Sequence, residues 1–250
     1  MKRYLMIQNK GVAPIEGFTT LGISTTRNDN TKGVIGQFGS KHAINLLLRN
    51  DIEPIIFCGL TKMSFYTKEY IINDGLVEQK VNKVFCRTSG KNSNTNKDLG
   101  FVLEYGVHDW NNINMALREF VANAIDRTIR ENENGCFKSA LNNNELSVDI
   151  IHENKMRARN KYTRIFIPLT QEVQQFYGEL PKRFLHFSEN PDIIKQKVLP
   201  KGINVNTLIY KNGVLVREVL DDRGNPELSL FDYNFDDELR LDESRNADDY

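Results

Sequence analysis

Three polar side chains stand at helical spacing within residues 111–130, the segment with the clearest helical pattern in the sequence. Glu119, Asn123 and Asp126 follow one another at i, i+4 and i+7, so an α-helix would present all three from one face. Two carboxylates and a carboxamide arranged in this way can position a water molecule, a divalent cation and a ligand amine together. The same spacing is also typical of the solvent-facing side of an amphipathic helix, so a second signal is needed.

The second signal is a glycine-rich segment, residues 33–43, which runs directly into another predicted helix that Ser40 would cap. Glycines allow backbone N–H groups to approach a phosphate, and a helix N-terminus favours its negative charge, to which Lys41 would add a positive partner. The segment is not a Walker A loop, because it lacks the final Gly-Lys-Ser/Thr. It is not a Rossmann fingerprint either, because no strand directly precedes it.

Together these segments resemble the GHKL superfamily of ATP-binding proteins, which includes gyrase B, the heat-shock-protein-ninety chaperones, histidine kinases and MutL, with MORC-type ATPases as close relatives. The N box of that family, Glu-x-x-x-Asn-Ala-x-Asp, is matched at all four fixed positions by residues 119–126. Residues 35–39 are similar to the glycine-rich lid of the chaperones, and residues 21–27 to the stretch before the MORC lid. Residues 9–13 resemble a degraded Asp-x-Gly-x-Gly motif.

The resemblance implies an ATP site with slow, Mg²⁺-dependent hydrolysis, on a Bergerat-type α/β sandwich. Glu119 would be the general base, Asn123 would hold Mg²⁺, and Asp126 would line the adenine side of the pocket with Asn9 and Gly11. Lid closure over ATP would then switch the conformation or drive formation of a homodimer. The remaining cofactor-binding residues implied are Gly22, Ser24, Thr25, Arg27, Gly36, Gln37, Phe38, Gly39, Ser40 and Lys41.

The motifs depart from the family pattern in their order and in two residues. The N box comes last instead of first, which implies a circular permutation with the old termini joined near residues 105–110. Asn9 stands where the family has an aspartate, and its carbonyl is a weaker, neutral acceptor for an adenine amino group. Ala13 replaces the second glycine. The altered motif favours a non-catalytic nucleotide-binding adaptor, whereas the intact Glu119 favours an ATPase.

The fold that the sequence predicts is α+β, with a mostly antiparallel sheet covered on one face by helices, then a C-terminal β hairpin and an acidic tail. We expect residues 1–170 to form the ATP-binding domain, residues 171–220 an additional α/β segment packed on it, and residues 221–250 the tail. The predicted strands are residues 4–7, 54–59, 63–67, 83–88, 101–105, 148–152 and 163–168, with a polar hairpin loop over 89–97 and a hairpin over 205–216.

The formal net charge of zero hides an asymmetry, because residues 218–250 carry a net charge of −9 and the rest of the chain carries +9. A basic body suits a phosphate-bearing ligand. It also leaves open a third function, a nucleic-acid or protein-binding module in which the motifs are accidental. The basic loop 155–161 and the basic, aromatic segment 182–187 are candidates for contact with nucleic acid, and equally for solvated surface.

Other patterns exclude several classes of protein. No apolar run approaches the roughly 18 residues of a membrane span, and the three cysteines are too far apart for a disulfide framework or a zinc site. We therefore expect a cytoplasmic protein with no membrane contact. Residues 232–243 match several positions of an EF-hand loop but have Asp237 where the turn needs glycine, so a chance match in an acidic segment is the simpler interpretation.

Overall fold

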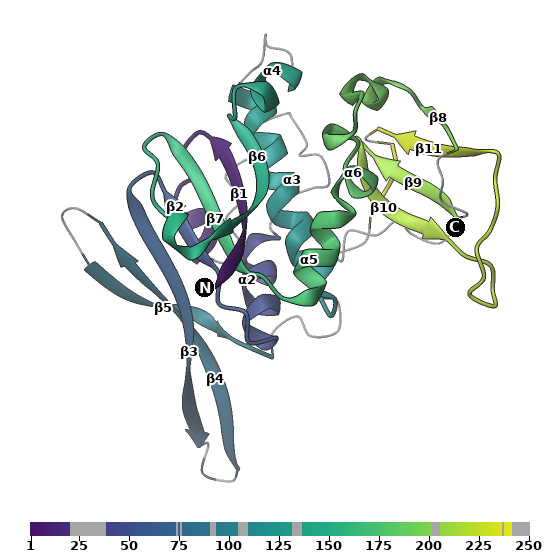
Figure 1. The fold of residues 1–250 in the computed structure, drawn as a ribbon. Helices are drawn as coiled ribbons and strands as arrows, with labels where there is room; N and C mark the ends of the chain where they lie inside the picture. Colours follow the sequence, from purple (N-terminus) through teal and green to yellow (C-terminus); the bar gives the residue numbers. More distant parts are fainter. Residues whose placement is uncertain are drawn as a thin grey trace. The chain divides into compact units, whose positions relative to one another are not determined.

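The computed structural model describes residues 1–20, 39–73, 75, 77–90, 94–104, 110–131, 137–201, 206–236 and 238–241. These residues belong to two compact units, the first reaching residue 177 and the second beginning at residue 178. The first unit contains a large antiparallel sheet and a few helices, as the sequence predicts (Figure 1). Among the described residues, no helix is both long enough and apolar enough to cross a membrane.

The sheet of the first unit has seven strands in the order β5-β4-β3-β2-β7-β1-β6, each antiparallel to its neighbours. The strand nearest the N-terminus therefore lies inside the sheet, between two strands that come much later in the chain. The strands are β1 (Arg3–Lys10), β2 (Ile55–Cys58), β3 (Thr61–Asn73), β4 (Glu78–Ser89), β5 (Asn94–Val102), β6 (Leu146–His152) and β7 (Tyr162–Pro168).

Two helices, α2 (Ser40–Arg49) and α3 (Ile113–Glu131), pack against each other and against the sheet. The second of them has an apolar stripe at helical spacing that is buried, since Ala116, Leu117 and Phe120 have no exposed surface. Burying each large side chain of this kind contributes about 1.5–3 kcal/mol. The remaining helices of this unit are short: α1 (Glu16–Thr19), α4 (Phe137–Asn142) and α5 (Gln171–Gly178), with a 3₁₀ turn, η1 (Glu153–Lys155).

The two faces of the sheet are covered differently. Side chains alternate between the faces along each strand, and Leu5 and Ile7 of β1 are buried on the helix side. On the other face, Tyr4, Met6 and Phe166 form a separate cluster that includes no residue of α2 or α3. Among the described residues, α2 and α3 therefore lie on the same face of the sheet, which agrees with the arrangement that the sequence predicts.

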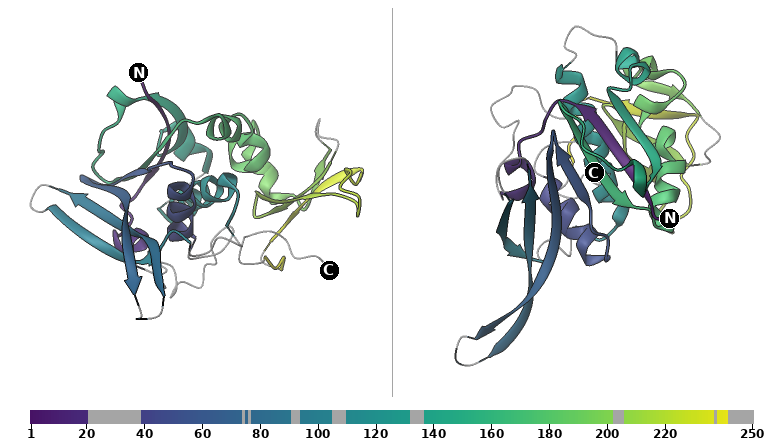
Figure 2. Two further views of the ribbon diagram at one scale, coloured as in Figure 1. Left: turned by 90° about the horizontal axis from the view of Figure 1, so that it is seen from below. Right: turned by 60° about the vertical axis from the view of Figure 1, so that its left-hand side comes forward.

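The strands at one end of the sheet differ from their predicted lengths. Thr61–Asn73 and Glu78–Ser89 pair along their whole length and extend past the rest of the sheet as a two-stranded ribbon (Figure 2). Asn94–Val102 forms β5, although residues 94–97 are expected to be loop and 101–105 strand. Polar cross-strand contacts explain the shift: Asn96 accepts a hydrogen bond from Tyr66 at 2.6 Å, and Asp98 pairs with Lys83 at 3.1 Å.

The second unit is a four-stranded sheet in the order β10-β9-β11-β8, with short helical turns around it. Its hairpin turns at Asn212 and Gly213, both with positive φ, as the Asn-Gly pair predicts. The elements are α6 (Leu180–Arg183), η2 (Leu185–Phe187), η3 (Pro191–Lys195), β8 (Val198–Pro200), β9 (Thr207–Lys211), β10 (Val214–Val219) and β11 (Phe231–Phe235).

Part of the expected acidic tail belongs to this sheet. Residues 231–235 form β11, which pairs with both β8 and β9. Asp232 is buried and accepts hydrogen bonds from the Leu208 backbone at 2.9 Å and from Lys201 at 3.2 Å. Asn234 is buried as well and accepts a bond from the Gly213 backbone at 2.8 Å. Asp232 and Asn234 therefore make structural hydrogen bonds within the sheet. Residues 231–235 form a strand, whereas an EF-hand requires a loop here.

A buried histidine makes the stability of the second unit depend on pH. Burial lowers the pKa of His186 to about 4 from 6.5. As the pH falls, His186 is protonated in the unfolded chain near pH 6.5 and in the folded chain only near pH 4. The free energy of unfolding is therefore at its full value above pH 6.5 and decreases as the pH drops toward 4. We expect urea denaturation to show that the wild type loses about 2 kcal/mol between pH 7 and pH 5, and that His186→Gln does not lose it. The exposed His152→Gln is the control; equal losses in all three proteins would contradict this assignment.

Candidate functional site

The helical stripe of predicted site residues meets the beginning of α2. Glu119 is 2% exposed, although it is a carboxylate on a helix. The side-chain amide of Asn123 donates to Glu119 Oε1 at 3.0 Å and to Ser40 Oγ at 3.1 Å. The structure thus brings together one residue of the glycine-rich segment and two residues of the N-box-like segment. Asp126, one turn further along the same helix, is partly buried.

Gly39 is the N-cap residue of α2 and lies directly against Glu119. A Cβ atom added at Gly39 would overlap the carboxylate of Glu119, so any larger residue would force this side chain to move. The φ of Gly39 is −76°, an ordinary value, so the close approach and not the backbone conformation requires glycine here. Ser40 is not the N-cap, contrary to the sequence-based expectation, because its hydroxyl accepts from Asn123 and no side chain caps the helix.

Lys41 brings a positive charge to this contact between α3 and the beginning of α2, which we call the junction. It is 4% exposed, and burial lowers its pKa while the nearby Glu119 carboxylate opposes this shift. A buried ion is tolerated when an opposite charge lies close to it. The beginning of α2 therefore combines a lysine, a hydroxyl and a glycine next to a carboxylate on α3.

The turn after β1 lies beside the same helix. Asn9 is 6% exposed, and its amide donates to the Lys10 carbonyl at 2.8 Å. Gly11 has φ of +94°, and a Cβ atom there would lie 2.8 Å from Glu131 Oε1 and 2.5 Å from Arg127 Nε. Arg127 is one helical turn, about 6 Å, beyond Asn123. The Asn9–Gly11 turn therefore lies against the helical turn of α3 that follows Asn123.

Thr163, which belongs to none of the sequence motifs, fixes this turn. Thr163 of β7 lies directly opposite Asn9 in the strand register. Its hydroxyl donates to the Gly11 carbonyl at 2.8 Å and accepts from the Ala13 backbone at 2.8 Å. Thr163 is 3% exposed. A threonine within a strand is a weak signal in sequence, because β-branched residues are common in strands for packing reasons alone.

Several predicted site residues lie outside the described part of the chain. This holds for the lid between Gly22 and Phe38. It also holds for most of residues 105–110, where a circular permutation would join the old termini. His42, which follows the glycine-rich segment, stacks on the buried Trp110 with ring centroids 5.4 Å apart. The residues concerned in the lid are Gly22, Ser24, Thr25, Arg27, Gly36, Gln37 and Phe38.

The donor set at the junction suits a hard cation. The described residues contain no group of three or more His, Cys, Asp or Glu side chains that could hold a metal ion by themselves. Glu119, Asn123 and Ser40 nevertheless offer a carboxylate, a carboxamide and a hydroxyl, the oxygen ligands that Mg²⁺ takes when a phosphate supplies the rest. The Asn123 amide nitrogen is engaged by two partners, so its Oδ1 is the atom that remains for a ligand.

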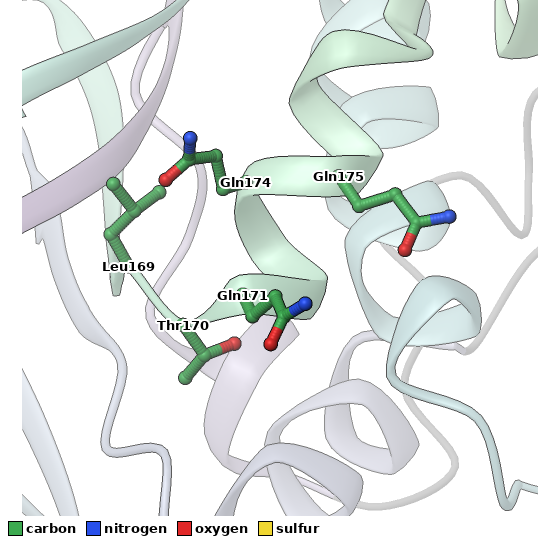
Figure 3. A pocket seen from close by; sticks show the side chains of 5 residues that line it. All are labelled: Leu169, Thr170, Gln171, Gln174 and Gln175. Carbon is green, nitrogen blue, oxygen red and sulfur yellow. The ribbon is translucent and has the colours of Figure 1, made fainter.

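A surface hollow in the first unit lies elsewhere and has different chemistry. It is lined by Leu169, Thr170, Gln171, Gln174 and Gln175 at the beginning of α5 (Figure 3). Figure 3 shows Gln174 and Gln175 leaving the helix in opposite directions. Thr170 accepts a hydrogen bond from the Val173 backbone at 3.3 Å, as a helix-capping residue does. No lining side chain titrates, so this hollow offers no acid, base or nucleophile.

No family model matches the chain, and no curated protein or solved structure shows significant similarity to it.

The close contact at Gly39 makes a testable prediction. We expect Gly39→Ala to destabilise the first unit by about 1–3 kcal/mol, because the new methyl group overlaps the buried carboxylate of Glu119. Adding Glu119→Ala should relieve the clash, so the two substitutions should show a coupling energy of about 1 kcal/mol or more in urea denaturation.

The control for this cycle is Gly178→Ala, because a Cβ atom at Gly178 meets nothing within 4 Å. It should cause no loss of stability. Strictly additive effects of the substitutions at 39 and 119 would show that the two residues do not constrain each other.

Proposed function

We propose that the first unit is a circularly permuted, GHKL-type ATP-binding domain with a Bergerat-like fold, and that it hydrolyses ATP slowly with Mg²⁺. One observation carries the proposal: Glu119 and Asn123 meet Gly39 and Ser40 across two helices that are far apart in the sequence. The resemblance pairs the same two segments around one nucleotide. An accidental motif match gives no reason for these segments to be in contact.

The general base in this proposal is Glu119. Its carboxylate is buried, and the hydrogen bond from Asn123 at 3.0 Å orients it. A carboxylate held in this way can position a water molecule and accept its proton during attack on a phosphoryl group. Lys41 lowers the electrostatic cost of the negative charge and sits at the helix end where phosphates bind favourably.

Asn123 and Asn9 bind the ligand in this proposal. Asn123 Oδ1, with the Ser40 hydroxyl beside it, would hold Mg²⁺, which when bound neutralises phosphate charge. The amide nitrogen of Asn9 is used within its own turn, so its carbonyl oxygen is the atom that can accept from an adenine amino group. Asp126 and Gly11 would line this adenine side, and ATP binding would close the lid and favour a homodimer.

A non-catalytic adaptor is the second candidate, and Asn9 is the observation that favours it. A neutral carbonyl gives a weaker hydrogen bond to an adenine amine than a carboxylate does. Such a site can bind a nucleotide without efficient turnover. The two candidates share the binding site and differ only in whether Glu119 acts as a base, so one substitution separates them.

The decisive experiment compares the wild type with Glu119→Gln, which keeps the size of the side chain but removes the base. Both proteins should be stabilised by Mg²⁺ and a non-hydrolysable ATP analogue, by roughly 2.7 kcal/mol at 100 times the Kd. Phosphate release should fall about 100-fold or more in the variant, the usual contribution of a general base. Asn123→Ala should weaken the dependence of binding on Mg²⁺.

The control is Glu153→Gln, which changes an exposed carboxylate on η1. Equal phosphate release by wild type and Glu119→Gln, with binding retained, would favour the adaptor. A melting temperature that millimolar ATP and Mg²⁺ leave unchanged would contradict both candidates.

A further inference from the structure

The face of the sheet that α2 and α3 leave uncovered continues onto the β3–β4 ribbon. Residues directly opposite each other in an antiparallel pair share a face. Ser64 lies opposite Ile55, which lies opposite Phe166, a member of the cluster away from the two helices. Tyr66, two residues further along β3, therefore points to the same side. We call this side of the sheet the open face; on the ribbon it carries Tyr66, Lys68, Tyr70, Lys83, Phe85 and Arg87.

Three aromatic rings form a continuous stack on the open face. Tyr66 and Phe85 have ring centroids 5.6 Å apart, and Phe85 and Tyr70 have centroids 6.1 Å apart, with an interplanar angle of 21° in both pairs. Tyr70, at the distal end of the stack, is 43% exposed. Tyr66 is partly exposed, and Phe85, which is 8% exposed, lies between the two tyrosines. Large rings are normally buried in a core or an interface, so two accessible tyrosine rings packed on a buried Phe85 on a projecting ribbon require an explanation.

Every ring of this stack is accompanied by a cation. Lys83 Nζ lies 4.8 Å from the centre of the Tyr70 ring, and Lys68 Nζ lies 5.2 Å from that of Phe85. The Arg87 guanidinium lies 5.5 Å from the centre of the Tyr66 ring. Such contacts are weak where they are exposed to solvent, so the cations can leave the rings for a better partner.

The positive charge is specific to this side of the ribbon. Among the described residues of the open face near the stack, Asp98 is the acidic group that forms an ion pair, with Lys83 at 3.1 Å. On the opposite side of the same ribbon, Lys80 is paired with Glu69 at 3.3 Å. The two sides thus differ in net charge and in aromatic content, although the same two strands form them.

The same chemistry continues onto the neighbouring strand β7. Arg164 shares the open face, since it lies opposite Phe57 and two residues from Phe166. Arg164 donates to the Arg157 carbonyl at 2.8 Å. Burial lowers the pKa of Arg164, and the positive charges of Arg159 and Arg157 lower it further. Arg159 also lies over the Tyr162 ring, 3.6 Å from its centre. This strand is separated from β3 by β2 alone, about 10 Å across the sheet.

We propose that the open face binds single-stranded nucleic acid, with bases stacked on the accessible rings of Tyr66 and Tyr70, which pack on Phe85, and phosphates on the surrounding lysines and arginines. Base stacking on exposed aromatic residues combined with a positively charged path for the backbone is the chemistry that recognises single strands. On binding, bases replace the cations over the rings and the cations move to phosphates. This activity is separate from the proposed nucleotide site, and none of its residues lies there.

A single strand fits this face better than a duplex or an acidic protein. The bases of a duplex are stacked on one another, so the rings would have no base to contact and the lysines alone would bind. An acidic protein segment would satisfy the charges but would leave the aromatic stack exposed. Only a flexible chain that carries both phosphates and flat rings uses both features of the open face.

The test measures fluorescence anisotropy of mixed-sequence DNA and RNA oligonucleotides of about 20 nucleotides with the full chain in the absence of ATP. We expect Tyr70→Ala to weaken binding about tenfold, and Tyr70→Phe, which keeps the ring, to bind like the wild type. Lys68→Ala and Arg87→Ala should each reduce the slope of log K against log salt by about 0.7. Comparing the affinities for the two oligonucleotides then shows whether the open face prefers DNA or RNA.

Lys80→Ala is the matched control, because it removes a lysine from the opposite side of the same ribbon. It should leave affinity and salt slope unchanged, and circular dichroism should show that all variants fold. Three results would each overturn the proposal: no binding at low salt, equal binding of heparin or polyglutamate, or binding of the wild type to duplex as tight as to single strands. A failure here leaves the ATP-binding proposal intact, because the two assays share no ligand and no residue.

Discussion

Burial of one carboxylate governs how the main helices of the first unit meet. Glu119 is almost inaccessible to solvent, and a buried charge needs partners within reach. Asn123 supplies one on the same helix, Lys41 supplies an opposite charge, and Gly39 leaves the space. The contact between α2 and α3 is thus set by polar requirements as much as by the apolar stripe beneath it. A core built only for stability would place an apolar residue here, and this is why the junction is read as a site.

Some residues of the site could be predicted from sequence and others could not, for reasons that differ from residue to residue. The spacing of Glu119, Asn123 and Asp126 follows from helix geometry alone, so their common face was predictable. Helical periodicity did not predict the contact with Ser40, because it says nothing about which helices pack together; only the family resemblance paired the two segments. Thr163 was missed because its role depends on a strand register that joins residues 152 positions apart.

The fold shows the same division between local and non-local information. Alternating and β-branched patterns located most strands, and the Asn-Gly pair located a hairpin. The polar residues 94–97 were predicted as loop because they contain no apolar residue. The prediction was wrong because a strand at the exposed edge of a sheet does not need apolar residues. Residues 231–235 were assigned to a tail by charge, whereas burial of Asp232 and Asn234 places them in a sheet. Charge describes the surface of a chain, and pairing depends on partners that lie far away in sequence.

The central position of β1 has a consequence for the order of folding. This strand is flanked by β6 and β7, while β2 to β5 follow one another as neighbours in both sequence and space. The meander from β2 to β5 can therefore form from local contacts, whereas β1 has no strand partner until β6 has been synthesised, about 140 residues later. Closing so long a loop costs entropy before any contact compensates for it. The turn at Asn9 is thus completed late, after the helices that will face it have been made.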